Sequence, residues 1–218
     1  MLQTFPVFLS NNGDKVPAGI RMVEPAAGTK QAERGVLYAV VDLFGTQHKR
    51  EQLVEYEQLV EQMLAEVENA YYSNKGKQSA VLASAVQKAM SFLADFNAQQ
   101  ARSGGGEALS GGVICAGILN NRLMMAHAGP MFAMLSAGKR VEMYPLEAEA
   151  AAQLSSSDSV LRRELNPGDA IFLGASAWEE AISLRVLAAT VAHIDPENRF
   201  DAASGILEQV RSAYLDSC

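Results

Sequence analysis

A continuous apolar run from Val36 to Val41 is the first strong structural signal along the chain. The run is rich in valine, follows Gly35 and ends at the charged residue Asp42. Strands that are covered on both faces have nearly continuous apolar sequences instead of alternating ones. The pattern therefore predicts a central strand, buried on both faces, that ends beside Asp42.

Apolar residues then recur every three or four positions in two consecutive stretches, which is the spacing of one face of an α-helix. The first stretch runs from Arg50 to about Tyr72, and the second follows residues 73–77 and ends in the polar, glycine-rich segment 97–107. The stripes consist of Leu53, Tyr56, Val60, Met63, Leu64, Val67 and Tyr71, and of Leu82, Val86, Met90, Leu93 and Phe96. Two long amphipathic helices are expected.

Four short apolar runs follow, separated by residues that favour turns. Asn120-Asn121 favours the positive φ angles of a two-residue hairpin turn, and Gly129-Pro130 and Ala137-Gly138 separate the later runs. The runs are residues 112–119, 122–128, 131–137 and 139–145. We expect them to form an antiparallel meander.

The last part of the chain predicts one more strand and two more helices. A Pro-Gly-Asp turn at 167–169 leads into an apolar strand from Ala170 to Leu173, and helical spacing returns at 177–193 and from about Asp201 to Tyr214. This order favours an α+β fold with an antiparallel sheet core and helices packed outside it. A parallel sheet would need a helix between most of its strands.

Composition and charge narrow the classes of partner. The chain has 218 residues, of which 49% are hydrophobic and 20% charged, so we expect one domain over residues 1–218 with one sizeable core. The formal net charge is −7 and the longest basic run is His48-Lys49-Arg50. Nucleic acid is therefore not an expected partner, because binding its phosphates needs a concentrated basic patch.

Cysteine usage and hydropathy favour a soluble protein of the cytoplasm. Cys115 and Cys218 have no C-x-x-C spacing, which fits a reducing compartment. The chain has no apolar run of about 18 residues and no basic segment followed by a long apolar one at its start. No membrane partner is expected.

Three segments carry a resemblance to a known family. GVLYAVVDLFG (35–45) is similar to a strand that leads to Asp-Gly-Met-Gly-Gly, and SGGVICAGILNNRLMMAHAGPMFAML (110–135) to a Gly-Thr-Thr strand, a hairpin and Asn-Val-Gly-Asp-Ser-Arg. LNPGDAIFLGASAWEE (165–180) is similar to Pro-Gly-Asp, an apolar strand and Ser-Asp-Gly-Leu-Trp-Glu. In this order the segments resemble the metal-dependent protein phosphatases of type 2C, the PPM family, over roughly residues 35 to 185.

The resemblance implies a four-layer α-β-β-α fold, an antiparallel β-sandwich of two sheets flanked by helices. In the family, a cleft at one end of the sandwich holds two divalent metal ions bridged by aspartates. A metal-activated water attacks the phosphorus of phosphoserine or phosphothreonine. Several carboxylates are required, because Mg²⁺ and Mn²⁺ prefer oxygen ligands and two adjacent dications repel unless anions lie between them.

When the family pattern is matched residue by residue, only one of its metal ligands has a clear counterpart in this sequence. Asp42 stands at the aspartate of Asp-Gly-Met-Gly-Gly, whereas Leu43 replaces the glycine whose carbonyl joins the metal shell. At Gly-Asp-Ser-Arg, Gly129 is kept but Pro130 replaces the aspartate. These substitutions remove charge from the expected cleft.

The remaining expected ligands are also altered. At Ser-Asp-Gly, Ser176 replaces the metal-binding aspartate and Ala177 the glycine. Arg21 and Glu24 match the upstream phosphate-binding arginine and a further ligand only by loose alignment. The final Asp-Asn has no counterpart before Cys218. Either the natural chain continues beyond Cys218, as the N-terminal domain of a longer protein, or the last strands are missing, and the sequence leaves both open.

Three hypotheses about function follow. The first is a non-catalytic pseudophosphatase without a cofactor, which acts in regulation through an unknown protein or small-molecule partner. The alternative is an active Mn- or Mg-dependent serine/threonine protein phosphatase with a rearranged ligand set, such as Asp42, Glu24 and either Asp169 or Asp195. The third is an interaction module of a longer regulatory protein. Whether the chain forms a homo-oligomer stays open.

Other candidate residues have simpler structural explanations. His127 follows an apolar strand and has no Asp, Glu or Cys at metal spacing, so a structural role is favoured over a ligand or general acid. The methionines on the predicted strands are expected to fill the core. Ser110-Gly111-Gly112 has the composition of an anion cradle, but a tight turn into a strand explains it equally well.

Overall fold

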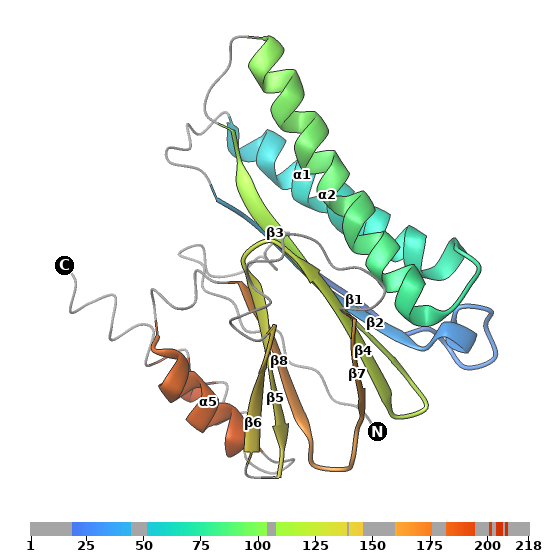
Figure 1. The fold of residues 1–218 in the computed structure, drawn as a ribbon, viewed down its shortest axis with the longest axis vertical. Coiled ribbons are helices and arrows are strands. Elements are labelled where there is room, and N and C mark those ends of the chain that lie inside the picture. Colours follow the sequence, from blue (N-terminus) through green and yellow to red (C-terminus); the bar gives the residue numbers. More distant parts are fainter. Residues whose placement is uncertain are drawn as a thin grey trace.

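The computed structural model describes residues 19–44, 52–103, 108–138, 140–145, 160–175, 182–194, 201, 204–206 and 208. The predicted cleft positions Ser176 and Ala177, and the candidate ligand Asp195, lie outside these residues. In chain order the elements are β1 (Ile20–Val23), the 3-10 turn η1 (Ala32–Arg34), β2 (Val36–Phe44), α1 (Gln52–Ser73), α2 (Gln78–Arg102), β3 (Ser110–Leu119), β4 (Arg122–Ala128), β5 (Met131–Ala137), β6 (Arg140–Tyr144), β7 (Leu161–Glu164), β8 (Ala170–Ala175) and α5 (Leu184–Ala192) (Figure 1).

The strands form two antiparallel sheets. Sheet A has the order β1-β2-β3-β4-β7, and sheet B has the order β6-β5-β8. The apolar run that predicted a central strand is β2, which pairs with β1 on one side and with β3 on the other. Sequence and structure therefore agree on this strand, which brings Asp42 to the end of sheet A.

The predicted meander is divided between the two sheets. β3 and β4 form a hairpin in sheet A, whereas β5 and β6 pair in sheet B. The change of sheet takes place at Gly129-Pro130, where Gly129 has a φ of 73°. The expectation of one continuous meander is therefore wrong, because this bend turns the chain away from sheet A instead of returning it beside β4. Both faces of β5 are covered as a result, and its first six residues are all buried.

Four layers stack in the order helices, sheet A, sheet B, helix (Figure 1). Helices α1 and α2 cover the outer face of sheet A, and Tyr71, Met63 and Leu82 are fully buried between them and the sheet. A second cluster, which includes Ile114 and Met125, fills the space between the sheets. A third joins the outer face of sheet B to α5. This is the predicted four-layer α+β sandwich.

Two short edge strands are not predicted by the sequence pattern. β1 and β7 have four residues each, and both contain arginine. They therefore lack the apolar alternation by which a strand is predicted from the sequence. Charged side chains on edge strands discourage pairing with other chains, so such strands lack the usual apolar signal.

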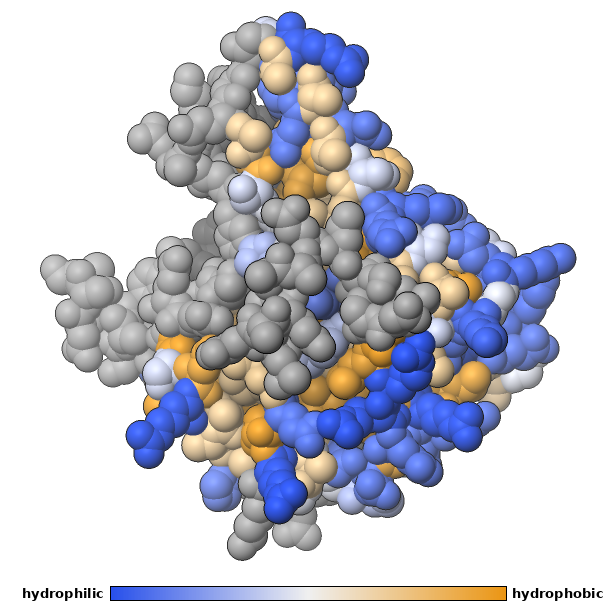
Figure 2. Space-filling model, viewed as in Figure 1, coloured by the Kyte–Doolittle hydropathy of each residue, from blue (hydrophilic) through white to orange (hydrophobic). Residues whose placement is uncertain are grey.

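On the face shown in Figure 2, hydrophilic side chains border an apolar band over the region where β5, β7 and β8 lie.

The first of the two predicted C-terminal helices begins later than expected. Helix α5 begins at Leu184, where the Ser183 side chain accepts a hydrogen bond from the Val186 amide and so caps the helix. The predicted last helix is helical at the described positions 201, 204–206 and 208. Within the described part of the chain, no helix is both long and apolar enough to cross a membrane.

Candidate functional site

Asp42 lies on the inner face of sheet A, at the end of β2. Side chains alternate between the two faces of a strand. Val41 and Leu43 belong to the core under α1 and α2, whereas Val40 packs against the cluster between the sheets. Asp42 therefore points to the same side as Val40, toward sheet B, and it is half-buried.

Two glycines continue the row that Asp42 begins. Asp42 pairs with Gly112 of β3, and the same register places Gly129 beside Gly112 just after β4. A Cβ atom at Gly129 would lie 2.2 Å from the carbonyl oxygen of Gly111, so the close approach of these backbones requires glycine. This end of sheet A therefore presents one carboxylate and two residues without side chains.

Met131 fills the space above Gly112. A Cβ atom at Gly112 would lie 2.6 Å from Met131 Cγ and 3.0 Å from Met131 Sδ. Met131 is 3% exposed and pairs with Ala175, the last residue of β8, which is also buried between the sheets. We call the part of the sandwich formed by Asp42, Gly112, Gly129, Met131 and Ala175 the Asp42 end.

Leu43 contributes to the Asp42 end through its backbone alone. Its side chain is 3% exposed and packs on the opposite face of sheet A, under α1 and α2. Its carbonyl oxygen accepts a hydrogen bond from the Tyr56 hydroxyl of α1. The carbonyl that the resemblance assigns to a metal shell is thus engaged by a side chain of this protein.

Burial controls the electrostatics around Asp42. Desolvation raises the pKa of the Asp42 carboxyl, and a hydrogen bond with the Leu43 backbone opposes this in part. The pKa of Tyr56 is also raised, first by burial and then by the negative charge of Asp42. The surroundings of Asp42 therefore favour its neutral form more than water does.

Glu24 and Asp169, the proposed alternative ligands, lie at the other end of the sandwich. The Glu24 carboxylate accepts a hydrogen bond of 2.7 Å from the Tyr38 hydroxyl. Glu24 follows β1, whose last residue pairs with Leu37, and Asp42 lies five positions beyond Leu37, roughly 17 Å along a strand. Asp169 accepts from the Asn166 amide at 2.8 Å in the turn before β8, at the opposite end of that strand from Ala175. The strands therefore do not bring these carboxylates to Asp42.

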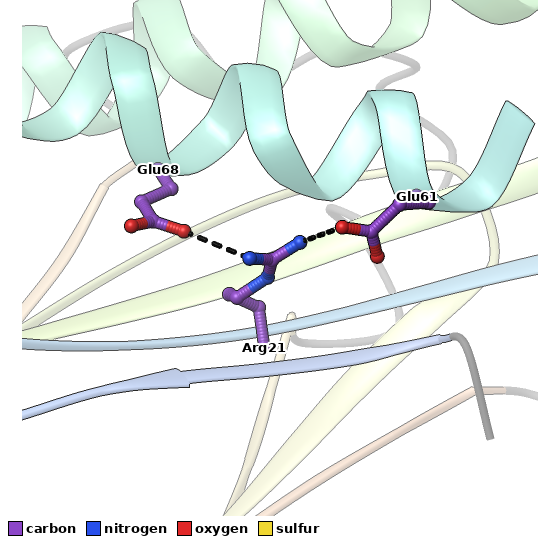
Figure 3. Close-up of polar contacts among 3 residues, drawn as sticks. All are labelled: Arg21, Glu61 and Glu68. Atoms are coloured by element: carbon purple, nitrogen blue, oxygen red, sulfur yellow. Dashed lines mark hydrogen bonds and ion pairs between the residues drawn. The ribbon is translucent and has the colours of Figure 1, made fainter. Parts of the chain in front are cut away.

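Arg21, the candidate phosphate-binding residue, points away from the space between the sheets. It pairs with Ala39 on the helix-facing side of sheet A, and its guanidinium forms ion pairs with Glu61 and Glu68 of α1 (Figure 3). The Arg21–Glu68 distance is 3.1 Å. Arg21 thus ties edge strand β1 to α1, on the opposite face of sheet A from Asp42.

His127 is buried in the core between the sheets. Its Nδ1 lies 3.3 Å from the Tyr144 hydroxyl, and the two rings meet edge to face with centroids 5.1 Å apart. The Tyr144 hydroxyl also donates to the Met125 carbonyl at 3.3 Å. Burial lowers the pKa of His127, so its neutral form is favoured. These contacts support the structural role expected for this histidine.

The described residues do not fit a pair of divalent metal ions. Among them, no group of three or more His, Cys, Asp or Glu side chains lies close enough to hold a metal ion. Two adjacent dications need several oxygen ligands, whereas the described neighbours of Asp42 at this end include a thioether, a methyl group and two glycines.

Comparison of the sequence with family models and with curated proteins gives no match. Comparison of the structure with solved structures gives many. The serine/threonine phosphatase Stp1 from Staphylococcus aureus superimposes with a TM-score of 0.65 at 12% identity, over 97% of this chain and 89% of that one. PppA from Pseudomonas aeruginosa superimposes with a TM-score of 0.59 at 13% identity, over 91% of this chain and 86% of that one. The serine/threonine phosphatase PstP/Ppp from Mycobacterium tuberculosis superimposes with a TM-score of 0.55 at 16% identity, over 89% of this chain and 91% of that one.

The chain has the PPM-type phosphatase fold. Identities this low show a shared fold but not a shared activity, because activity depends on the residues of the site. The resemblance of the three sequence segments is confirmed at the level of the PPM fold, including the placement of Asp42 at one end of the sandwich.

Sequence reasoning missed the residues that surround Asp42. Met131 had been assigned to the core only as one of several strand methionines, and Tyr56 only as part of a helix stripe. The Gly111-Gly112 pair was the available signal, because adjacent glycines in a strand mark a close approach by other atoms. Leu43 Cδ2 would lie 2.4 Å from a Cβ at Gly111, just as Met131 packs on Gly112. These glycines accommodate side chains of the protein itself.

Proposed function

We propose that this chain is a catalytically degenerate PPM domain, a pseudophosphatase that acts in regulation by binding a protein or a small molecule. One observation carries the proposal: Asp42 keeps its carboxylate, but its described neighbours at this end include Met131 and two glycines, and no group of three or more His, Cys, Asp or Glu side chains forms among the described residues. We expect no resident metal or cofactor, no nucleic-acid or membrane partner, and a cytoplasmic location.

A comparison within the fold supports this proposal. The catalytic domain of the phosphatase PstP, which has a TM-score of 0.54 to this chain, was solved in complex with two manganese ions. A metal pair of this kind activates water and neutralises developing charge in an in-line displacement. In this chain, Pro130 and Ser176 replace two of the aspartates that the family pattern has. A single carboxylate does not offset the repulsion between two dications.

The second candidate function is an active metal-dependent serine/threonine protein phosphatase. It is favoured by the fold, because the structural neighbours include serine/threonine phosphatases. Since Glu24 and Asp169 lie at the other end of the sandwich, this function would need oxygen ligands from residues outside the described part of the chain. We therefore rank it second.

Phosphatase assays test the choice between the two functions. Hydrolysis of p-nitrophenyl phosphate and of a phosphothreonine peptide is measured with excess Mn²⁺ for the unmodified protein, Asp42→Ala and Asp95→Ala. Asp95 is an exposed residue of α2 and serves as the matched control. We expect no turnover above the protein-free background for any of the three. Turnover that Asp42→Ala abolishes and Asp95→Ala leaves intact would establish the active enzyme.

A further inference from the structure

The inner face of the sandwich at the Asp42 end is packed by residues of both sheets. Gly112 provides a gap in sheet A, and the Met131 side chain from sheet B enters it. Met131 and Ala175 belong to the same buried cluster as Ile114 and Met125, which lie further inside the sandwich. The packing of the core therefore continues to Gly112, the direct strand partner of Asp42.

We infer that Met131 has closed the inner face over Gly112 at the Asp42 end: its side chain fills the gap there, so neither metal ions nor a phosphorylated side chain reach the space between Gly112 and sheet B, although the Asp42 carboxyl itself stays partly exposed. The inference rests on the proposed function in one respect: the Asp42 end corresponds to the cleft of the PPM fold. It adds a consequence for the ligands of this domain. Phosphate esters are not its ligands in the space over Gly112.

Several features combine to close the end. A Cβ at Gly112 would be too close to Met131 Cγ, so Met131 leaves no room for a side chain at this position. The Leu43 carbonyl is engaged by Tyr56, and Arg21 is held by Glu61 and Glu68 on the other face of the sheet. The Leu43 carbonyl and the Arg21 guanidinium, which the resemblance would assign to a metal and to a phosphate, are thus engaged in contacts within the protein.

Oxidation of methionine in the folded protein tests the closure directly. After a short exposure to hydrogen peroxide, peptide mass spectrometry compares Met131 with Met22, which is 46% exposed, and with Met63, which is fully buried under the helices. We expect Met131 to react at about the rate of Met63 and at least about tenfold more slowly than Met22, because oxidation follows solvent exposure. A rate for Met131 close to that of Met22 would overturn the inference.

A glycine substitution provides an independent test of the same contact. In Gly112→Ala the new methyl group has to displace Met131, so we expect Met131 to become more reactive and the melting temperature to fall. Gly205→Ala is the matched control, because a Cβ at Gly205 meets no atom of the described residues within 4 Å. Equal Met131 reactivity in the two variants would contradict the inference, and the peroxide result on the unmodified protein stands if Gly112→Ala does not fold.

The two proposals fail in distinguishable ways. Metal-dependent turnover in a protein whose Met131 stays protected would contradict the proposed function but leave the packing of Met131 intact. A reactive Met131 without turnover would contradict the closure alone. Calorimetric titration with a phosphothreonine peptide completes the test: we expect no heat of binding, and binding that protects Met131 from peroxide would contradict the closed end.

Discussion

Desolvation of Asp42 exceeds the stabilisation that its charge receives from the Leu43 backbone, so the pKa of this carboxyl is raised. In an active metal centre, cations would offset the same desolvation. In the metal-free protein, the charged form of Asp42 opposes folding at neutral pH. The residue that most resembles a metal ligand is therefore expected to destabilise the protein.

Asp42→Asn tests this expectation, because asparagine keeps the shape of the side chain and removes its charge. We expect the free energy of unfolding at pH 7.5 to rise by less than about 1 kcal/mol, since the carboxylate is half-buried and partly screened by solvent. Urea denaturation measures the change, and the exposed Asp95→Asn is the control. A variant clearly less stable than the unmodified protein would show that the charge of Asp42 is stabilised in the fold.

The sign of the pH dependence provides a further check on this variant. Because the folded-state pKa of Asp42 is raised, its stabilising contribution is present below the unfolded pKa of about 3.9 and is lost as the pH rises through the folded value. The advantage of Asp42→Asn should therefore shrink as the pH is lowered from 7.5 toward 4. An advantage that does not depend on pH would have another origin.

At the scale of elements, Tyr71 secures α1 to the segment before β2. Its hydroxyl donates to the Arg34 carbonyl at 2.6 Å and accepts from the Gln78 side chain at 2.6 Å. Tyr71 is fully buried, whereas the neighbouring Tyr72 is half-buried and donates to the Gly35 carbonyl at 3.0 Å. The two tyrosines make comparable hydrogen bonds at different depths.

This difference predicts unequal effects of removing the two hydroxyls. Tyr71→Phe leaves the partly buried Arg34 carbonyl and Gln78 side chain with one hydrogen bond fewer at a fully buried position, so we expect a loss of about 1–3 kcal/mol in the free energy of unfolding. Tyr72→Phe should cost clearly less, because water can replace its hydroxyl. Urea denaturation of both variants measures the comparison. An equal or larger loss for Tyr72→Phe would contradict the burial-based account.

Elements whose signals are local could be predicted from the sequence. The apolar stripes predicted α1 and α2, and Asn120-Asn121 predicted the turn between β3 and β4, where both residues have positive φ. The change of sheet after Gly129 could not be predicted from local spacing, since a glycine-proline bend suits a hairpin and a crossing equally well. The short strands β1 and β7 depend on their neighbours for pairing and carry little signal of their own.

At the scale of the molecule, the PPM fold is retained although Pro130 and Ser176 stand where the family pattern has aspartates. The resemblance predicted both sheets, the outer helices and the position of Asp42 at one end. It did not predict what faces Asp42, because contact between Gly112 and Met131 joins two sheets and depends on their stacking. The lost aspartates were visible in the sequence, but the packing at the Asp42 end required the structure.

The absence of a metal pair at the Asp42 end is the central claim, and titration with manganese tests it most directly. The paramagnetic resonance signal of free Mn²⁺ is followed as the folded protein is added. We predict that the signal stays at the level of a protein-free control, because the described residues at this end offer too few oxygen ligands. Binding of two ions per chain with micromolar affinity, abolished in Asp42→Asn, would contradict the account.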